Sequence, residues 1–280
     1  MNKFLIIANS DKSETVSLAN EIKEYLLLKG AYCKIILGYV EKNMVEEGTD
    51  CIIVLGGDGT LLAAARNLVG LDIPFIGINC GNLGFLSEAT PDLINETLDN
   101  LLQNNYTLEN RMMLTGQIVR NNEVVSENIA LNDIVISRSG PLRVIDFDIY
   151  VNGMKLNQYK ADGMIVSTPT GSTAYSMSAG GPIVKPSANL ILLTPICPHT
   201  LNTRSIILDA EDIVEIKVMN KRGVENDERF AYFDGAMGTP LISGDRISIR
   251  KSKISTGIIK LSSRSFLEIL KRKMSDNEDR

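Results

Sequence analysis

The sequence predicts an α/β domain followed by an all-β domain, and three features support this fold class. Short apolar runs alternate with segments of helical periodicity over the first hundred residues. After Tyr106, short β-rich runs separated by turn residues dominate, and a helical pattern returns at Ser265–Met274. We therefore expect an α/β domain over residues 1–105, a β-sandwich over residues 106–263, and a helix at 264–275 that packs back on the first domain.

The first domain is expected to contain a parallel sheet. Apolar residues at helical spacing run from Ser13 to Leu28 and stop before Gly30, a residue suited to ending a helix. The expected strands are Phe4–Ala8, Cys33–Leu37, Cys51–Leu55 and Pro74–Asn79, and the expected helices are Ser13–Leu28, Thr60–Val69 and Thr90–Leu102. Strands that alternate with helices in this way predict parallel pairing with crossover helices.

The second domain is expected to be a sandwich of short strands. Turn pairs such as Asn152-Gly153 and Asp234-Gly235 separate several of its β-rich runs. The expected strands are Leu114–Arg120, Asn128–Ser137, Val144–Val151, Met164–Ser167, Ile206–Leu208, Ile213–Met219, Phe230–Phe233 and Arg246–Arg250. Many short strands with turn residues between them are typical of an all-β sandwich.

Composition excludes several classes of protein. The chain has 280 residues with a formal net charge of −5, and aromatic residues make up 5% with no Trp. Scattered basic residues and few aromatics argue against a nucleic-acid surface. No apolar run is long enough to span a membrane. The four cysteines, Cys33, Cys51, Cys80 and Cys197, match no zinc-binding spacing, and we expect a reducing, cytoplasmic setting.

A glycine-rich turn lies between an expected strand and an expected helix. It reads Leu-Gly-Gly-Asp-Gly-Thr over residues 55–60, so Gly56, Gly57 and Gly59 surround Asp58, and Thr60 follows. Glycines let backbone amides approach an anion closely, and a helix N-terminus favours phosphate. No lysine follows the glycines and the spacing is not G-x-G-x-x-G, so the usual nucleotide fingerprints do not apply. We expect Gly56, Gly57 and Thr60 to contact phosphate.

Asp58 makes this turn a candidate for phosphoryl transfer. A carboxylate repels bound phosphates unless a metal ion neutralises it or it accepts a proton from an attacking hydroxyl group. The alternative is an Asp-Gly turn whose side chain is solvated. The strand-to-helix context favours the first interpretation.

A second candidate cluster is rich in small hydroxylated residues. Lys160-Ala161-Asp162-Gly163 precedes the stretch Thr168–Pro182, in which Ser, Thr, Gly and Ala leave room for a ligand and Tyr175 offers a stacking face. A plain loop explains such a stretch equally well. A serine hydrolase is excluded because the nucleophile elbow is incomplete and His199 is the only histidine. Asn132-Asp133, at the start of a β-rich run, is a third candidate or a turn device.

The order of these motifs resembles that of the bacterial NAD kinases. The matching segments are Gly56–Thr60, Asn132-Asp133, Asp162-Gly163, Thr168–Pro182 and Phe233-Asp234-Gly235, and together they extend over nearly the whole chain. The resemblance implies a Rossmann-like N-terminal domain, a β-sandwich C-terminal domain and a cleft between them. It also implies transfer of a phosphoryl group to the adenosine-ribose 2′-hydroxyl of NAD, and assembly into homodimers or homotetramers.

The resemblance also assigns roles to residues. Asp58 corresponds to the residue that accepts the proton of the 2′-hydroxyl, and Gly59 beside it is implied to bind substrate by holding phosphate. Contacts to the dinucleotide are implied for Phe85, Asn132, Asp133, Arg143, Lys160, Asp162, Thr173, Ala174, Tyr175, Ser176, Met177 and Ser178. Two positions depart from the family pattern: Asp133 is one methylene shorter than the usual Glu, and Ala236 replaces a residue that is often polar.

The remaining expectations concern the metal cofactor, the phosphoryl donor and the alternative functions. Activity is expected to need a divalent cation, Mg²⁺, because no Walker lysine is present. Asp58 and Asp234 are the candidate protein oxygens. The phosphoryl donor is ATP, another triphosphate or polyphosphate, and the sequence leaves these open. A lipid kinase with the same glycine-rich turn and a non-catalytic dinucleotide sensor are the alternatives. The first would need an apolar groove, and the second would not need Asp58.

Overall fold

The fold was analysed in a computed structural model of the chain. The structure describes residues 1–81, 84–139, 144–199, 204–219, 229–236, 238–261 and 266–275. The chain forms two compact units, one made of Met1–Arg111 and the chain from Thr256 onward, the other of Met112–Ser255. The boundaries fall inside two long strands, β6 (Thr107–Arg120) and β17 (Arg246–Lys260). None of the described helices is both long and apolar enough to cross a membrane.

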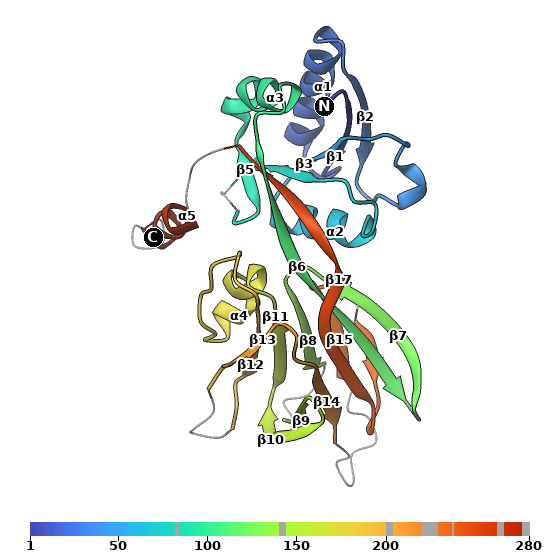
Figure 1. The fold of residues 1–280 in the computed structure, drawn as a ribbon, viewed down its shortest axis with the longest axis vertical. Coiled ribbons are helices and arrows are strands. Elements are labelled where there is room, and N and C mark those ends of the chain that lie inside the picture. Colours follow the sequence, from blue (N-terminus) through green and yellow to red (C-terminus); the bar gives the residue numbers. More distant parts are fainter. Residues whose placement is uncertain are drawn as a thin grey trace. The chain divides into compact units, whose positions relative to one another are not determined.

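The N-terminal unit is built on a parallel sheet (Figure 1). Its strands are β1 (Lys3–Ala8), β2 (Tyr32–Leu37), β3 (Cys51–Leu55), β4 (Phe75–Ile78) and β5 (Ser87–Ala89). They lie in the order β2-β1-β3-β4, and β5 and the end of β17 pair with β4. β1, β3 and β4 are buried along nearly their whole length, as expected for strands of a parallel sheet covered on both faces.

Three of the four described helices of this unit pack against the sheet or against each other beside it. The helices are α1 (Ser13–Leu28), α2 (Asp58–Asn67), α3 (Ile94–Leu102) and α5 (Phe266–Ser275), with single 3₁₀ turns at Lys42–Met44 and Pro91–Leu93. Helices α1 and α3 pack with each other and share a core with alternate strand residues such as Phe4 and Ile53 (Figure 1). Helix α2 contacts β3 and β4 and buries Leu61 and Ala64.

The C-terminal unit is a sandwich of two sheets. One contains β10 (Met154–Ala161), β9 (Ile145–Val151), β14 (Val214–Val218) and β17 in antiparallel order, with β6 beside β17 and β7 (Glu123–Ala130) beside β6. The other is antiparallel throughout, in the order β13 (Ile206–Asp209), β12 (Leu190–Ile196), β11 (Gly163–Ser167), β8 (Asp133–Arg138), β15 (Arg229–Phe233) and β16 (Thr239–Leu241).

The two sheets enclose one apolar core. Inward residues of both, such as Phe147 and Ile216 from the first sheet and Ile136 and Met164 from the second, are each fully buried.

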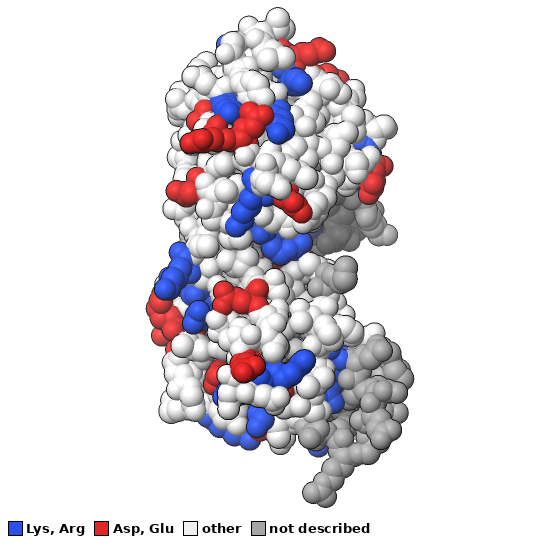
Figure 2. All heavy atoms as spheres, turned by 90° about the vertical axis from the view of Figure 1, so that its right-hand side faces the viewer, with Lys and Arg blue, Asp and Glu red and all other residues white. Residues whose placement is uncertain are grey.

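Between β11 and β12 the chain forms a 3₁₀ turn at Thr170–Thr173 and the short helix α4 (Tyr175–Ser178). Figure 2 shows basic and acidic side chains mixed on one face of the molecule rather than gathered by sign.

The expected fold class is confirmed, with α/β structure followed by a largely all-β unit. Several local expectations are wrong. The expected strand Asn128–Ser137 is interrupted at Leu131-Asn132, and its halves, β7 and β8, belong to different sheets. Helix α2 begins at Asp58, two residues before the expected start. Four strands, β5, β10, β12 and β16, were not expected. The edge strand β10 shows no alternation over its first five residues, which are all exposed.

Candidate functional site

Asp58 is the first residue of helix α2, directly after the buried strand β3. Gly57 precedes it as the N-terminal cap residue, and no side chain caps this end of the helix. Gly56 is buried against Thr60, so that a Cβ at this position would overlap the Thr60 side chain. The turn therefore brings a carboxylate to the N-terminus of a helix, where backbone amides favour an anion.

The Asp58 carboxylate is held by the loop that follows β4. Its Oδ2 accepts the backbone N–H of Phe85 at 2.8 Å, and its Oδ1 accepts that of Leu86 at 3.2 Å. A Cβ at Gly84 would overlap the carboxylate, so the close approach requires glycine there. A carboxylate has about four lone-pair sites, and these two hydrogen bonds leave room for a further donor. The structure thus orients Asp58 without saturating it.

The backbone beside Asp58 is open. Gly57 and Gly59 are exposed, and a Cβ at either position would meet no atom within 4 Å. The side chains of Asp58 and Thr60 are partly exposed. A ligand can therefore reach the first-turn amides of α2, which is the arrangement expected for phosphate contacts.

Phe85, an expected dinucleotide contact, lies next to helix α5. Its ring is 6.4 Å from that of Phe266, centroid to centroid, and the Lys273 ammonium group is 5.2 Å from its centre. The strand after Phe85 is anchored as well, because Glu88 of β5 forms a 2.7 Å ion pair with Lys260 and accepts the N–H of Leu261. The loop that holds Asp58 is thus fixed by the C-terminal part of the chain.

In the C-terminal unit, Asn132 and Asp133 lie where β7 ends and β8 begins. Both are buried, with 8% of Asn132 and 5% of Asp133 exposed. The Asp234 carboxylate accepts the backbone N–H groups of Leu131, Asn132 and Asp133 at 2.8, 2.7 and 3.2 Å. Asp234 belongs to a turn after β15, about a hundred residues further along the chain. The sequence indicates Asp234 only as a candidate metal ligand and does not predict this role.

The carbonyl side of the same segment is bound by β11 and the residues after it. The Asn132 carbonyl oxygen accepts the N–H of Thr168 at 2.8 Å and the hydroxyl of Ser167 at 3.2 Å, and Thr168 Oγ1 donates to the Leu131 carbonyl at 2.6 Å. Gly171 lies against the Asn132 carbonyl with no room for a Cβ. The start of the hydroxyl-rich stretch is therefore joined directly to Asn132-Asp133.

The side chains of Asn132 and Asp133, which form the corner between β7 and β8, are suited to a polar ligand. The Asn132 Oδ1 is buried and has no hydrogen-bond partner in the described part of the chain. Burial, reinforced by the nearby Asp234 carboxylate, raises the pKa of Asp133 to about 7. A buried acceptor without a donor is unfavourable, so a ligand hydroxyl that donates to it would be bound strongly.

The expected contacts of the hydroxyl-rich stretch divide into inward and outward residues. Ser176 is buried, and its hydroxyl lies 3.1 Å from Thr194 Oγ1, so it supports the loop from within. Tyr175 and Met177 are 45% and 39% exposed, Ser178 is exposed, and Thr173 and Ala174 are partly buried. The outward residues are available to a ligand.

Two further expected contacts lie apart from this corner. Asp162 precedes β11, whereas Asn132-Asp133 lies level with its other end, where Ser167 pairs with Asp133. Five strand residues separate the two places, which corresponds to roughly 16 Å. Asp162 forms a 3.2 Å ion pair with Arg138, which sequence reasoning did not single out, and Lys160 is exposed on β10. Arg143 lies outside the described residues.

The described residues do not form a metal site of their own. No group of three or more His, Cys, Asp or Glu side chains among them has the arrangement to hold an ion. Both candidate ligands are engaged by backbone N–H groups, Asp58 by two and Asp234 by three. The described residues therefore show no protein cage for Mg²⁺.

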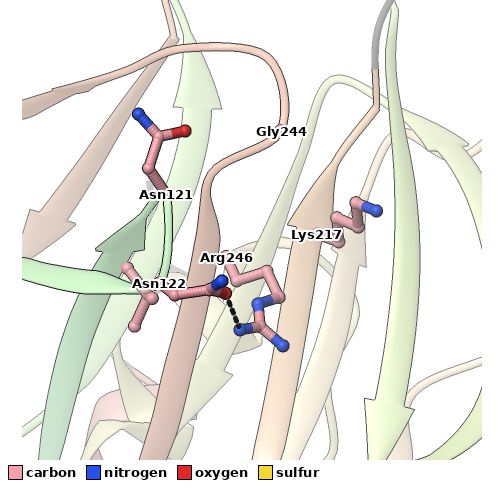
Figure 3. Close-up of a pocket in the computed structure, with 6 residues that line it drawn as sticks. Asn121, Asn122, Lys217, Gly244 and Arg246 are labelled. Carbon is pink, nitrogen blue, oxygen red and sulfur yellow. Dashed lines mark hydrogen bonds between the residues drawn. The ribbon is translucent and has the colours of Figure 1, made fainter.

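A separate hollow of about 300 Å³ lies beside the β6–β7 turn (Figure 3). Its lining residues are Val119, Asn121, Asn122, Lys217, Gly244 and Arg246. The Arg246 guanidinium donates to Asn122 Oδ1 at 3.5 Å, near the limit for a hydrogen bond. None of the residues expected at the functional site lines this hollow.

Comparison with known proteins identifies relatives along the whole chain. The family model of the ATP-NAD kinase N-terminal domain matches residues 37–106, and that of the ATP-NAD kinase C-terminal domain matches residues 131–261. The NAD kinase of Lachnospira eligens is 46% identical over 98% of this chain and all of its own length. That of Agathobacter rectalis is 43% identical over 99% of both chains.

Solved structures share the fold. The crystal structure of yeast NADH kinase complexed with NADH superposes with a TM-score of 0.82 at 24% identity, covering 94% of this chain and 84% of that one. The structure of an NAD kinase from Archaeoglobus fulgidus in complex with ATP gives a TM-score of 0.77 at 24% identity, covering 94% and 95%.

Proposed function

The chain belongs to the ATP-NAD kinase family and is a kinase that acts on NAD, and we propose that it phosphorylates the 2′-hydroxyl of the adenosine ribose. ATP supplies the phosphoryl group, and the products are NADP and ADP. The observation that carries this proposal is the placement of Asp58, a carboxylate oriented by two backbone amides at the N-terminus of a helix that follows a glycine-rich turn.

Asp58 acts as the general base. As the 2′-oxygen of the ribose forms its bond to the γ-phosphorus, the bond from that phosphorus to the bridging oxygen breaks, and the hydroxyl proton passes to Asp58. The amides of Phe85 and Leu86 fix the carboxylate before the substrate arrives. Orientation of this kind accounts for a large part of phosphoryl-transfer catalysis.

The exposed amides at the start of α2 bind phosphate oxygens. Gly57 and Gly59 leave this backbone uncovered, and the helix dipole favours negative charge there. Gly56 and Thr60 shape the turn by packing against each other. These residues supply hydrogen bonds and a partial positive charge in place of the lysine that a P-loop would provide.

The corner of the C-terminal unit binds the nucleoside part of NAD. Asn132 Oδ1 and the Asp133 carboxyl group accept hydrogen bonds from ribose hydroxyls, and the outward face of Thr173–Ser178 lies along the ligand. Support comes from the unpartnered, buried oxygen of Asn132 and from the hydrogen bonds that join Thr168 to Asn132.

Several finer features belong to the same proposal. A divalent cation, Mg²⁺, accompanies the donor and is held by its phosphates, since the described residues offer no cage for it. The enzyme works as a homodimer or homotetramer in the cytoplasm. The four free cysteines, of which Cys33 and Cys51 are buried, are in keeping with a reducing compartment.

The test is an assay for NADP with a panel of donors and acceptors. Purified protein is incubated with NAD and ATP, other triphosphates or polyphosphate, and NADP is measured with an NADP-specific dehydrogenase. A diacylglycerol dispersion replaces NAD in a parallel reaction. Steady NADP formation with ATP is expected. Phosphorylation of the lipid but not of NAD would support a lipid kinase, and NAD binding without turnover would support a sensor.

A further inference from the structure

Asp234 lies in a turn whose backbone is strained. The residues Phe233-Asp234-Gly235-Ala236 form a tight turn closed by the Ala236 N–H and the Phe233 carbonyl at 3.0 Å. Asp234 has φ +49° and Gly235 has φ +66°. Asp tolerates this left-handed conformation better than most residues, and Asp-Gly is a preferred pair for such turns. The backbone alone therefore explains an Asp or an Asn at position 234.

The side chain makes contacts that the turn does not require. Its two oxygens accept three consecutive backbone N–H groups, those of Leu131, Asn132 and Asp133. The Asp234 N–H in turn donates to the Asp133 carbonyl at 3.0 Å. Asn offers one acceptor oxygen, so it cannot reproduce bonds to both carboxylate oxygens. Hydrogen bonds to an ionised acceptor are also stronger than those to a neutral one.

The clamped segment carries the two side chains that the proposed function assigns to the ribose. Asp234 binds the N–H edge of Leu131–Asp133, while Ser167 and Thr168 bind its carbonyl edge. Hydrogen bonds thereby fix the backbone of this segment on both edges. The side chains of Asn132 and Asp133 are the parts of the segment that can still adjust to a ligand. The Asn132 Oδ1 has no partner in the described part of the chain, which points to a ligand.

The arrangement has an electrostatic cost. Two carboxyl groups lie close together at a buried site, and both burial and the Asp234 charge disfavour the ionised form of Asp133. On the neighbouring strand, the residue paired with Asp133 is Ser167, which is neutral and does not offset this repulsion. A neutral residue at position 234 would avoid the repulsion but would lose the hold on the three N–H groups.

We propose that Asp234 is a positioning residue for NAD: its carboxylate holds the backbone of Leu131–Asp133 so that the side chains of Asn132 and Asp133 meet the ribose. The inference rests on the proposed function, because it concerns the same substrate. It assigns Asp234 no direct contact with substrate or metal. Its effect on the reaction passes through Asn132 and Asp133.

The test compares Asp234→Asn with Asp212→Asn. The Asp212 carboxylate accepts the Asp209 N–H at 2.9 Å and a side-chain donor from Asn152, in an exposed turn of the same unit. Each substitution removes one negative charge and perturbs a carboxylate that accepts a backbone N–H. The Asp234→Asn variant is expected to raise the KM for NAD about tenfold and to change kcat less, whereas Asp212→Asn leaves both unchanged.

The pH profile is a second readout, because it reports the charge state of Asp133 in NAD binding. In the wild type, NAD affinity should rise with pH through about 7 as Asp133 ionises and accepts a hydroxyl hydrogen bond. Loss of the Asp234 charge lowers the pKa of Asp133, so the midpoint of this rise moves to lower pH in Asp234→Asn. The Asp133→Asn variant should show no such rise.

A second variant, Asp234→Glu, tests position at constant charge, and it also replaces Asp234→Asn if that variant does not fold. Asp234→Glu retains the charge but displaces the carboxylate by one methylene, so NAD binding should weaken. If either folded variant shows a wild-type KM for NAD, the positioning role is wrong, whatever the pH midpoint. If the wild type forms no NADP, the proposed function fails instead, and the two failures are thereby distinguished.

Discussion

The Asp58 carboxylate and the backbone N–H of Phe85 are 2.8 Å apart although they lie 27 positions apart in the chain. The two loops meet because β3 and β4 are parallel neighbours, and both loops leave the same edge of the sheet. Ligands of open α/β sheets bind at the carboxyl ends of the strands. The contact therefore joins the glycine-rich turn and the next loop into one rigid support for the general base.

Gly84 is expected to be essential for the position of Asp58. A methyl group at this residue would overlap the carboxylate, so Gly84→Ala must displace the side chain, the loop or both. We expect kcat to fall by about 10²-fold, the effect of a displacement of ~1 Å in a reacting group. In the same loop, the nearest atom to a Cβ at Gly81 is 3.8 Å away, so Gly81→Ala is the matched control. Equal rates in the two variants would contradict the claim that the loop at Gly84 positions the Asp58 carboxylate.

Asp133 should make stability depend on pH. Its pKa rises from 3.8 to about 7 on folding, so the folded protein holds an extra proton between these values. The stabilisation from this group is full below pH 4 and is lost as pH rises through 7. In Asp133→Asn this loss is absent, so the variant should gain stability relative to wild type between pH 5 and 8. Urea unfolding of both proteins at the two pH values measures the free energy of unfolding. An equal change in this free energy from the lower to the higher pH in wild type and variant would refute the prediction.

Asp133 should also contribute to NAD affinity. We expect Asp133→Ala to weaken NAD binding by roughly 1–3 kcal/mol, because a buried ribose hydroxyl loses its acceptor. Asp133→Glu restores the carboxyl group with a longer reach and should bind NAD at least as well as the wild type. Calorimetric titration with NAD compares the three proteins. An unchanged affinity in the alanine variant would mean that Asn132-Asp133 serves only as a turn.

Turnover with ATP should require a divalent cation. The described residues form no metal cage, and no lysine follows the glycines of the turn, so the charge of the donor must be neutralised by an ion that it carries. Excess EDTA should abolish NADP formation, and added Mg²⁺ should restore it. Full activity in EDTA, with metal content checked by elemental analysis, would show that the protein alone neutralises the phosphates.

Local patterns predicted the N-terminal unit closely. Helix α1 spans Ser13–Leu28 and strand β3 spans Cys51–Leu55, both as expected, because apolar spacing and the flanking residues define these elements without reference to the rest of the chain. The sequence predicts the glycine-rich turn equally well. Its residues restrict the backbone directly, so the sequence alone indicates Asp58 as a candidate.

Contacts between distant segments could not be read in the same way. The strand expected at Asn128–Ser137 breaks at Leu131-Asn132 because Asp234 and Thr168 bind the backbone there, and neither residue is near in sequence. From the sequence alone, Asp234 is an acidic residue in a turn, and it is therefore interpreted as a candidate metal ligand. Ser176, expected to contact the dinucleotide, turns inward to Thr194. Tertiary hydrogen bonds decided each of these cases.

The most direct test of the account is the Asp58→Asn variant. The substitution removes the proton acceptor but keeps the size of the side chain, at the expense of one of the two hydrogen bonds from Phe85 and Leu86, so a small loss of stability is expected. Asp92→Asn, which removes an exposed charge in the same unit, is the control.

The measurement is the rate of NADP formation at saturating NAD and ATP, together with the dissociation constant for NAD. The account predicts a rate about 10²–10⁴-fold below wild type for Asp58→Asn, the range for a lost general base, with NAD affinity retained. The control should match the wild type in both. A rate near that of the wild type in folded Asp58→Asn would contradict the role of Asp58 as the base.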